Sequence, residues 1–258
     1  MLPAPRALLL DFGGVIVKSA RPEAEEVIPQ VIKRVKGLIG GLLSEEEIAS
    51  ELARAQQLRQ EFRASTGQEV GHQKLWREFV ADLWPEDARE KVVAHATELT
   101  YAWADRPSWT MVDGVTELLE FTLGAGLPVA VVSNTRCGQA HRDCLERLGL
   151  TGAFAHQIYS DELGVCKPNP EMIRVAAQAL WEAPAACWMV GDKRKDVECA
   201  RQAGAGAAIL MGDRPDEPPG QTDGHPGRPT HMHAADADPD ATVADGHELL
   251  KLLKKAMA

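Results

Sequence analysis

The fold of this chain is decided by Arg6–Ile16, which reads RALLLDFGGVI. An apolar run of strand length ends at the carboxylate of Asp11 and is soon followed by two glycines. This pattern is typical of a buried parallel strand that leads into a tight turn. Because ligands in open α/β sheets bind beyond the carboxyl ends of the strands, Asp11 is expected at a ligand-binding edge. A single aspartate of this kind can also be an ordinary strand end or a helix cap, so the interpretation depends on the later strands.

The composition indicates an acidic globular chain. It has 258 residues, of which 45% are hydrophobic and 26% charged, so it can bury a sizeable core. The formal net charge of -10 argues against binding to nucleic acid or to anionic membranes. The five cysteines are an odd number without a CxxC pair, and no signal peptide is evident. These features favour reduced thiols in a cytoplasmic protein.

A helical module is expected over residues 18–105, directly after the first strand. Ser44 with Glu47 forms a capping box, and Pro85 suits the first position of a helix. No strand is expected in this stretch, and short loops between helices predict a small four-helix bundle. The expected helices are Pro22–Ile39, Ser44–Phe62, Gln73–Leu83 and Pro85–Asp105.

Strands and helices alternate again from Trp109 onward. This alternation predicts an α/β fold with a Rossmann-like parallel sheet and helices on both faces, formed by residues 1–17 and 106–258. The expected later strands are Pro128–Val132, His156–Ser160, Cys187–Val190 and Ala207–Met211.

Residues 212–240 differ in kind from the rest of the core. They are rich in proline, glycine and aspartate, and Met232 is their one large apolar side chain. Such a segment buries too little apolar area to offset its ordering entropy, so a flexible loop within the core is expected. Its histidines, His225, His231 and His233, give only weak support for a transition-metal site, because thiolates and a fixed spacing are missing.

Polar residues recur where the predicted strands end. The chemistry they suggest is coherent, because a carboxylate without an adjacent histidine can itself be a nucleophile. Grouped carboxylates favour a hard cation such as Mg²⁺, while a hydroxyl, a backbone N–H and a lysine suit phosphoryl oxygens. Phosphoryl transfer needs mainly positioning and charge neutralisation, which this set supplies. The set consists of Asp11, Ser133 with Asn134, Lys167, and Asp192 with Asp196.

In the order and spacing of these motifs the sequence resembles the haloacid dehalogenase (HAD) superfamily, in its subgroup with a helical cap inserted after the first motif. The resemblance covers Ala7–Met211 and the tail from Ala241. It implies a Mg²⁺-dependent phosphatase that acts on a small phosphorylated metabolite through an aspartyl-phosphate on Asp11. It also implies that Ser133, Asn134 and Lys167 hold the phosphoryl group and stabilise its charge. The metal ligands it implies are Asp11, the backbone carbonyl of Gly13, Asp192 and Asp196.

One position departs from the family pattern. Most phosphatases of the superfamily carry a second aspartate two residues after the nucleophile, as general acid and base, and here that position is Gly13. General acid–base help is worth about 10²–10⁴ in rate. The substrate must therefore have a good leaving group, or the cap must provide a proton donor, or the enzyme is slow.

Other functions compatible with the same motifs remain open. In a 2-haloacid dehalogenase the aspartate attacks carbon without a metal, and that reaction also lacks the second aspartate; the Gly-Asp-x-x-x-Asp motif at Asp192 and Asp196 favours the phosphatase. A phosphonate-cleaving enzyme would need a Schiff-base lysine, which nothing in the cap marks. A regulatory or binding protein built on the scaffold would explain Gly13 as a trace of lost catalysis.

Substrate choice is expected to depend on the cap, because a closing lid supplies selective contacts. The candidate residues are His72, Lys74 and Arg77, in or beside a glycine-containing loop. The expected partner is a small phosphorylated molecule, with neither nucleic acid nor membrane, and the chain is expected to be a monomer or a homodimer.

Overall fold

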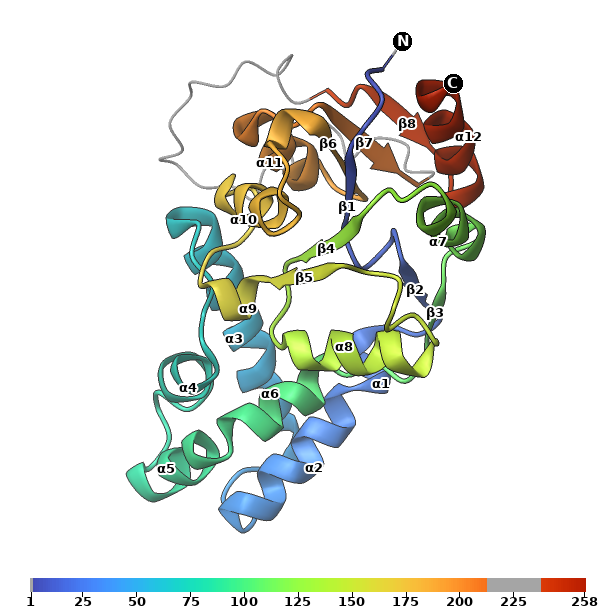
Figure 1. Cartoon of the computed structure of the whole chain (residues 1–258). Coiled ribbons are helices and arrows are strands. Elements are labelled where there is room, and N and C mark those ends of the chain that lie inside the picture. The colour runs from blue at the N-terminus through green and yellow to red at the C-terminus, as the bar shows by residue number, and fades with distance from the viewer. Residues whose placement is uncertain (1, 213–237) are drawn as a thin grey trace.

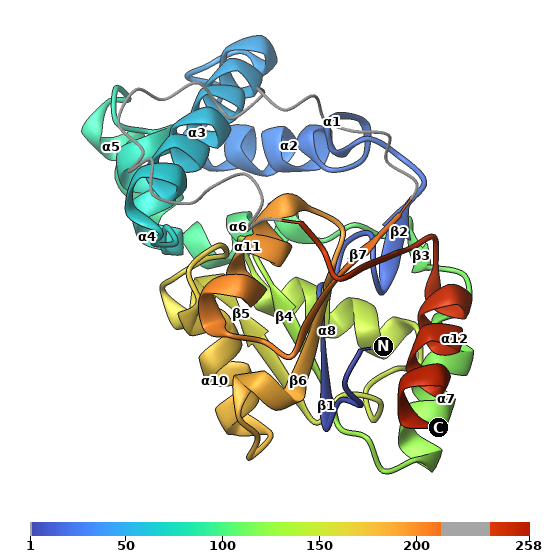
Figure 2. The ribbon, with the colours of Figure 1, turned by 90° about the horizontal axis from the view of Figure 1, so that it is seen from above.

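The chain folds into a parallel sheet flanked by helices and a separate layer of helices beside it (Figures 1 and 2). The computed structural model describes residues 2–212 and 238–258. Within these residues no helix is long and apolar enough to cross a membrane.

The sheet has six strands in the order β5-β4-β1-β6-β7-β8, and every neighbouring pair is parallel. β1 lies in the interior, where Leu9 is paired with Ala130 of β4 and with Met189 of β6. The predicted Rossmann-like α/β fold is therefore confirmed. The strands are β1 (Ala7–Leu10), β4 (Val129–Ser133), β5 (His156–Tyr159), β6 (Cys187–Gly191), β7 (Ala207–Met211) and β8 (Ala241–Val243).

Both faces of the sheet are buried, which explains why β1 is a continuous apolar run. Leu8 and Leu10 point into one hydrophobic cluster, and Ala7 and Leu9 into another on the opposite face. Each face is covered by helices of the core (Figure 1). These are α7 (Val115–Gly124), α8 (Gly138–Arg147), α9 (Ser160–Leu163), α10 (Glu171–Ala179), α11 (Arg194–Ala203) and α12 (Gly246–Met257), with the short 3-10 helix η2 (Pro184–Ala186) before β6.

The remaining helices form the cap, which has a hydrophobic core of its own. An antiparallel pair of short strands, β2 (Val17–Ser19) and β3 (Trp109–Met111), carries the chain into and out of it. β2 includes Lys18 and Ser19, where no strand was expected. The cap helices are α1 (Glu23–Glu26), α2 (Ile28–Ile39), α3 (Glu45–Thr66), α4 (His72–Lys74), the π-helix η1 (Leu75–Val80), α5 (Glu86–Ala94) and α6 (Ala96–Ala104).

Three of the four helices expected in the cap are interrupted. Pro29 lacks a backbone N–H, and the first helix is divided at Val27, just before it. The third begins as α4 and continues as the π-helix η1, and the fourth is divided at His95. The second is continuous, and its predicted capping box is present: the Ser44 hydroxyl accepts from the Glu47 N–H at 3.2 Å, and the Glu47 carboxylate accepts from the Ser44 N–H at 2.7 Å.

The segment expected to be a flexible loop, residues 212–240, lies mostly outside the described residues, as do its three histidines. Its last residue, Asp240, is held at the sheet. The Asp240 carboxylate accepts a hydrogen bond from the Ala208 N–H at 2.8 Å and pairs with Arg201 at 2.9 Å. The structured tail therefore begins before Ala241, earlier than the composition suggested.

A close approach of two helix starts generates a prediction about stability. A Cβ atom added at Gly246 would lie 2.5 Å from the carbonyl carbon of Gly114 and 2.6 Å from the Val115 nitrogen. Because neither backbone can yield easily, we expect Gly246→Ala to lower the free energy of unfolding by about 1–3 kcal/mol in urea denaturation. Gly152→Ala is the matched control, since its Cβ would meet nothing within 4 Å, and it should change stability by less than about 0.5 kcal/mol. Equal losses in the two variants would contradict this account.

Candidate active site

Three carboxylates meet at the carboxyl edge of the sheet. Asp11 follows β1 and Asp192 follows β6, and these strands are adjacent and parallel, so their ends lie together. Asp196 comes from the first turn of α11, which starts just beyond β6. Ligand atoms of the three side chains all lie within 4.8 Å of one another. We call this group the carboxylate cluster.

Lys167 lies inside the carboxylate cluster and is fully buried there. Its Nζ is 2.9 Å from Asp11 Oδ1 and 2.7 Å from Asp196 Oδ1, and it donates to the Val132 carbonyl at 2.7 Å. Burial alone would lower the pKa of Lys167, but the two carboxylates outweigh it and raise that pKa. Burial likewise tends to raise the pKa of Asp11, yet the ion pair with Lys167 holds it below its ordinary value. Both groups are therefore charged at neutral pH.

Asn134 fixes the backbone of Lys167. Its Oδ1 accepts from the Lys167 N–H at 2.8 Å, and its Nδ2 donates to the Lys167 carbonyl at 3.0 Å. The side chain expected to contact a phosphoryl group is thus engaged in holding the lysine. Ser133 is the buried last residue of β4, beside β1, and so lies at the same edge of the sheet.

The two glycines after Asp11 have different roles. Gly14 has a φ of +82°, and a Cβ there would lie 2.6 Å from Asp192 Oδ2, so this position excludes any side chain. A Cβ at Gly13 would meet nothing within 4 Å, and the backbone there is outside the left-handed region. Gly13 therefore has room for a side chain.

The carboxylate cluster fits a hard divalent cation. Asp192 Oδ1 is buried and has no hydrogen-bond partner among the residues that the structure describes. Burial and the neighbouring Asp11 raise the pKa of Asp192 to about 6. Mg²⁺ prefers oxygen donors, and the carboxylate cluster offers only oxygen donors. The unpartnered Asp192 oxygen is available to such a cation. Asp196 is less free, because it pairs with Lys167 and accepts from the Lys193 N–H at 3.0 Å.

Of the three cap residues expected to contact the substrate, His72 and Lys74 line one cavity, and Arg77 is not among the residues that line it. His72 lies at the junction with the core, with Nε2 2.9 Å from the Arg136 carbonyl. Lys74 lies over the ring of Phe62 and Arg77 pairs with Glu90 at 3.0 Å, so both are engaged within the cap. The substrate contacts expected of the three residues stay predictions.

A buried polar network that joins cap and core was not predicted. Arg59 of α3 donates to the Thr135 carbonyl at 3.0 Å and pairs with Glu69 at 2.8 Å. Glu69 in turn accepts from the Ser160 hydroxyl at 2.7 Å. A signal was available, because Arg59 continues the buried face of α3 after Ala55.

One buried histidine near the carboxylate cluster serves packing. His141 stacks on Phe12, the residue after Asp11, with ring centroids 3.9 Å apart. Burial lowers the pKa of His141 to about 3, so the ring is neutral at pH 7. It is therefore no source of an acidic proton at that pH.

Comparisons with known proteins agree on one family. The family model for haloacid dehalogenase-like hydrolases matches residues 5–204. The chain is 31% identical to the glyceraldehyde 3-phosphate phosphatase of Methanopyrus kandleri over 204 residues, which cover 77% of this chain and 81% of that protein. It is 37% identical to the phosphoserine phosphatase of Thermus thermophilus over 100 residues, which span 38% of this chain and only 40% of that protein's length. Its fold matches that of 2-haloacid dehalogenase from Pseudomonas syringae with a TM-score of 0.62, at 17% identity over 99% of each chain.

The raised pKa of Asp192 generates a prediction about pH and metal. Between its ordinary value of 3.8 and about 6, the native chain binds more protons at this group than the unfolded chain does. Stability of the native chain should therefore fall as the pH rises through that window. In chelator at pH 7, we expect Asp192→Asn to be more stable than the unmodified chain by about 2 kcal/mol. This value is reduced from the full effect of the pKa shift because solvent screens the partly exposed carboxylate.

The comparison is made by urea denaturation from pH 4 to pH 8. The advantage of Asp192→Asn should vanish near pH 4, where both side chains are neutral. Saturating Mg²⁺ should reverse the order, because it stabilises the form that binds it. If Asp192→Asn were less stable than the unmodified chain in chelator at pH 7, the raised pKa of Asp192 would be contradicted.

Proposed function

The chain belongs to the haloacid dehalogenase-like hydrolases, and from this premise we propose that it is a Mg²⁺-dependent phosphatase acting on small phosphorylated metabolites. One observation carries the proposal: an ionised, buried Asp11 is paired with Lys167 beside an Asp192 oxygen that has no partner in residues 2–212 and 238–258. This arrangement combines a nucleophile with a set of oxygen donors suited to a hard cation. Relatives named as phosphatases, one of them matched over 77% of this chain, support the same reaction.

Asp11 is the proposed nucleophile. Its carboxylate is ionised, and its Oδ1 accepts from the Phe12 N–H at 2.7 Å, which fixes its orientation. Attack of an Asp11 oxygen on phosphorus forms an aspartyl-phosphate as the bond from phosphorus to the leaving oxygen breaks, and that oxygen takes its proton from solvent. Attack of water on the same phosphorus then breaks the bond to Asp11, frees inorganic phosphate, returns a proton to solvent and restores the carboxylate. Bound by Asp11, Asp192, the Gly13 carbonyl and Asp196, Mg²⁺ would supply charge that offsets the repulsion between the carboxylates and the incoming phosphoryl group.

Lys167 and the end of β4 are proposed to contact the phosphoryl group. The Lys167 ammonium is held by fixed partners and stays charged, so it can stabilise negative charge that develops on a transferred phosphoryl group without reorganising. The Ser133 hydroxyl at the end of β4 is proposed as a phosphoryl contact. Asn134 acts mainly through Lys167, whose backbone it holds.

The last motif, at Asp192, supports a phosphatase over a metal-free dehalogenase. The fold is shared with a 2-haloacid dehalogenase and therefore does not decide between the two reactions. Asp192 supports the phosphatase, because its Oδ1 has no partner among the described residues and a bound cation would provide one. The helical layer over residues 18–105 is proposed to be the lid that selects the substrate.

The nucleophile is tested with an activated aryl phosphate. We expect Mg²⁺-dependent release of the phenol, lost in excess chelator and reduced by about 10³ or more in Asp11→Asn. Asp87→Asn, an exposed aspartate in the first turn of α5, is the matched control and should keep full turnover. Full activity in chelator, or chelator-resistant halide release from a 2-haloacid, would overturn the phosphatase assignment.

The missing general acid generates a second test. Because Gly13 cannot donate a proton, turnover should fall steeply as the pKa of the leaving group rises across a series of aryl and alkyl phosphates. Space for a Cβ at Gly13 makes Gly13→Asp feasible, and we expect it to raise turnover of the poorest leaving groups by about 10² while changing the best ones little.

Gly13→Asn is the control for this experiment, because it has the same size but no acidic proton. Equal gains from Asn and Asp would show that the effect is not proton donation. A turnover that does not depend on the leaving group, with chemistry shown to be rate-limiting, would mean that another residue supplies the proton.

A further inference from the structure

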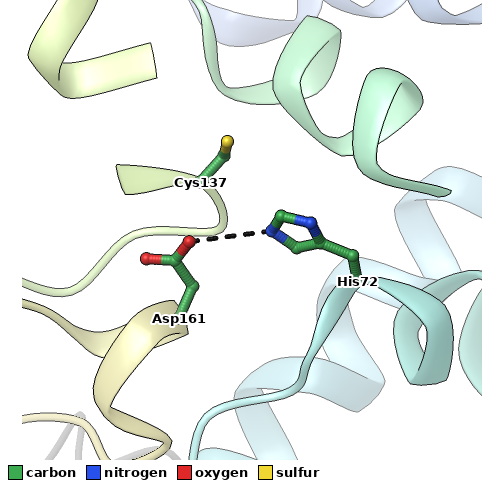
Figure 3. A group of neighbouring side chains, drawn as sticks. All are labelled: His72, Cys137 and Asp161. Atoms are coloured by element: carbon green, nitrogen blue, oxygen red, sulfur yellow. Dashed lines mark ion pairs between the residues drawn. The ribbon is translucent and has the colours of Figure 1, made fainter. Parts of the chain in front are cut away.

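A second group of potential metal ligands lies apart from the carboxylate cluster, at the junction of cap and core. Figure 3 shows His72, from α4 of the cap, facing Asp161 of α9 across their ion pair, with Cys137 beside them at the start of α8. Ligand atoms of the three residues all lie within 4.8 Å of one another. Nothing in the proposed phosphatase reaction uses this group.

We propose that His72, Cys137 and Asp161 form a Zn²⁺ site that joins the cap to the core. A thiolate, an imidazole and a carboxylate are the donors that Zn²⁺ accepts, and three protein ligands leave a fourth position for solvent. Mg²⁺ prefers oxygen donors alone. The carboxylate cluster would therefore select Mg²⁺, and the group with the thiol and the imidazole would select Zn²⁺.

Asp161 gives the clearest sign of a missing partner. Its side chain is only 6% exposed. Oδ2 accepts from the Gly138 N–H at 2.9 Å, which fixes the carboxylate, whereas Oδ1 is buried and has no hydrogen-bond partner within the described part of the chain. A buried carboxylate oxygen without a partner is costly, and a cation that binds this carboxylate would reduce that cost.

The surroundings of His72 suit a metal ligand. Its Nε2 is 3.6 Å from Asp161 Oδ2 and 2.9 Å from the Arg136 carbonyl, a contact that bound Zn²⁺ would displace, and its Nδ1 is 3.4 Å from the Thr97 hydroxyl. A metal-bound histidine usually donates its other ring N–H to an oxygen, which fixes the ring. Thr97, on α6 of the cap, provides that oxygen when Nε2 binds the metal.

Cys137 completes the set as the soft ligand. Burial raises the pKa of its thiol, so without a metal the sulfur keeps its proton. Binding of Zn²⁺ replaces that proton, which is released to solvent, and leaves a zinc thiolate. Tetrahedral bond lengths place ligand atoms roughly 3.3–3.8 Å apart, so the present group must contract by about 1 Å.

A cavity of about 490 Å³ reaches all three residues and gives the metal an entry path. Its lining also includes Lys74, Gln139 and Glu162. Because His72 belongs to the cap and the other two ligands to the core, bound Zn²⁺ would restrict the movement of one against the other.

Cobalt provides the direct test. The full chain, freed of metal with chelator, is titrated with Co²⁺ alone, and a thiolate-to-cobalt charge-transfer band should grow in the near ultraviolet to one equivalent. Zn²⁺ should abolish the band by displacement. The carboxylate cluster and the histidines of residues 213–237 contain no thiol and therefore produce no such band. Zn²⁺ at about 100 times its Kd should raise the Tm by about 5 °C.

Matched variants show which residues bind the metal ion. Cys137→Ser should lose the band, whereas Cys187→Ser, which changes a buried cysteine in β6, should keep it. His72→Gln retains the thiol and should weaken binding by at least about 100-fold, which keeps the proposal testable if Cys137→Ser fails to fold. The absence of a band, its persistence in Cys137→Ser, or unchanged affinity in His72→Gln would each overturn the proposal.

Discussion

The buried ammonium of Lys167 is the interaction on which the rest of the active site depends. Its charge lies between Asp11 and Asp196, in a place where an unpaired ion would cost several kcal/mol to bury. Each partner comes from a different part of the chain, at the end of β1 and in the first turn of α11. The sheet must therefore bring these segments into register before the charges can be compensated, and this ties the geometry of the site to correct folding of the core.

The parts of the fold that depend on local sequence could be predicted. An apolar run that ends at Asp11 specifies a strand buried on both faces, and similar strand ends at Ser133 and Asp192 place polar groups at one edge. Their meeting follows from parallel pairing, which is a property of the whole class of folds. The predicted membership of the HAD superfamily is confirmed by the family match for the same reason, since the motifs are ordered along the chain.

What sequence reasoning missed depends on how separate elements meet. Arg59 was overlooked because its partners, Glu69 and the Thr135 carbonyl, are known only when the cap is docked on the core. Lys74 and Arg77 have partners within the cap, the Phe62 ring and Glu90, which their positions in the sequence did not indicate. The sequence indicates only some of the helix breaks in the cap. Pro29 follows the break at Val27, whereas no proline or glycine accompanies the break at His95.

The loop after β4 links substrate chemistry to cap docking. Asn134 holds the backbone of Lys167, while the next residues are bound from the cap: Arg59 donates to the Thr135 carbonyl, and Glu23 accepts from Arg136 at 2.8 Å. A displacement of the cap therefore acts on the same few residues that position the lysine. If the cap closes as the proposed lid, this loop would couple its movement to the alignment of Lys167.

The pairing of β2 with β3 has a consequence for how such molecules diversify. Ser19 lies opposite Trp109, so the chain leaves the core and returns to it at neighbouring points. Everything between the two strands amounts to an insertion in the tip of a hairpin, and a short turn could replace it without altering the register of the six-stranded sheet. The inserted helices can thus be lengthened, shortened or exchanged as one unit during evolution, while the six-stranded sheet that carries the active site keeps its geometry.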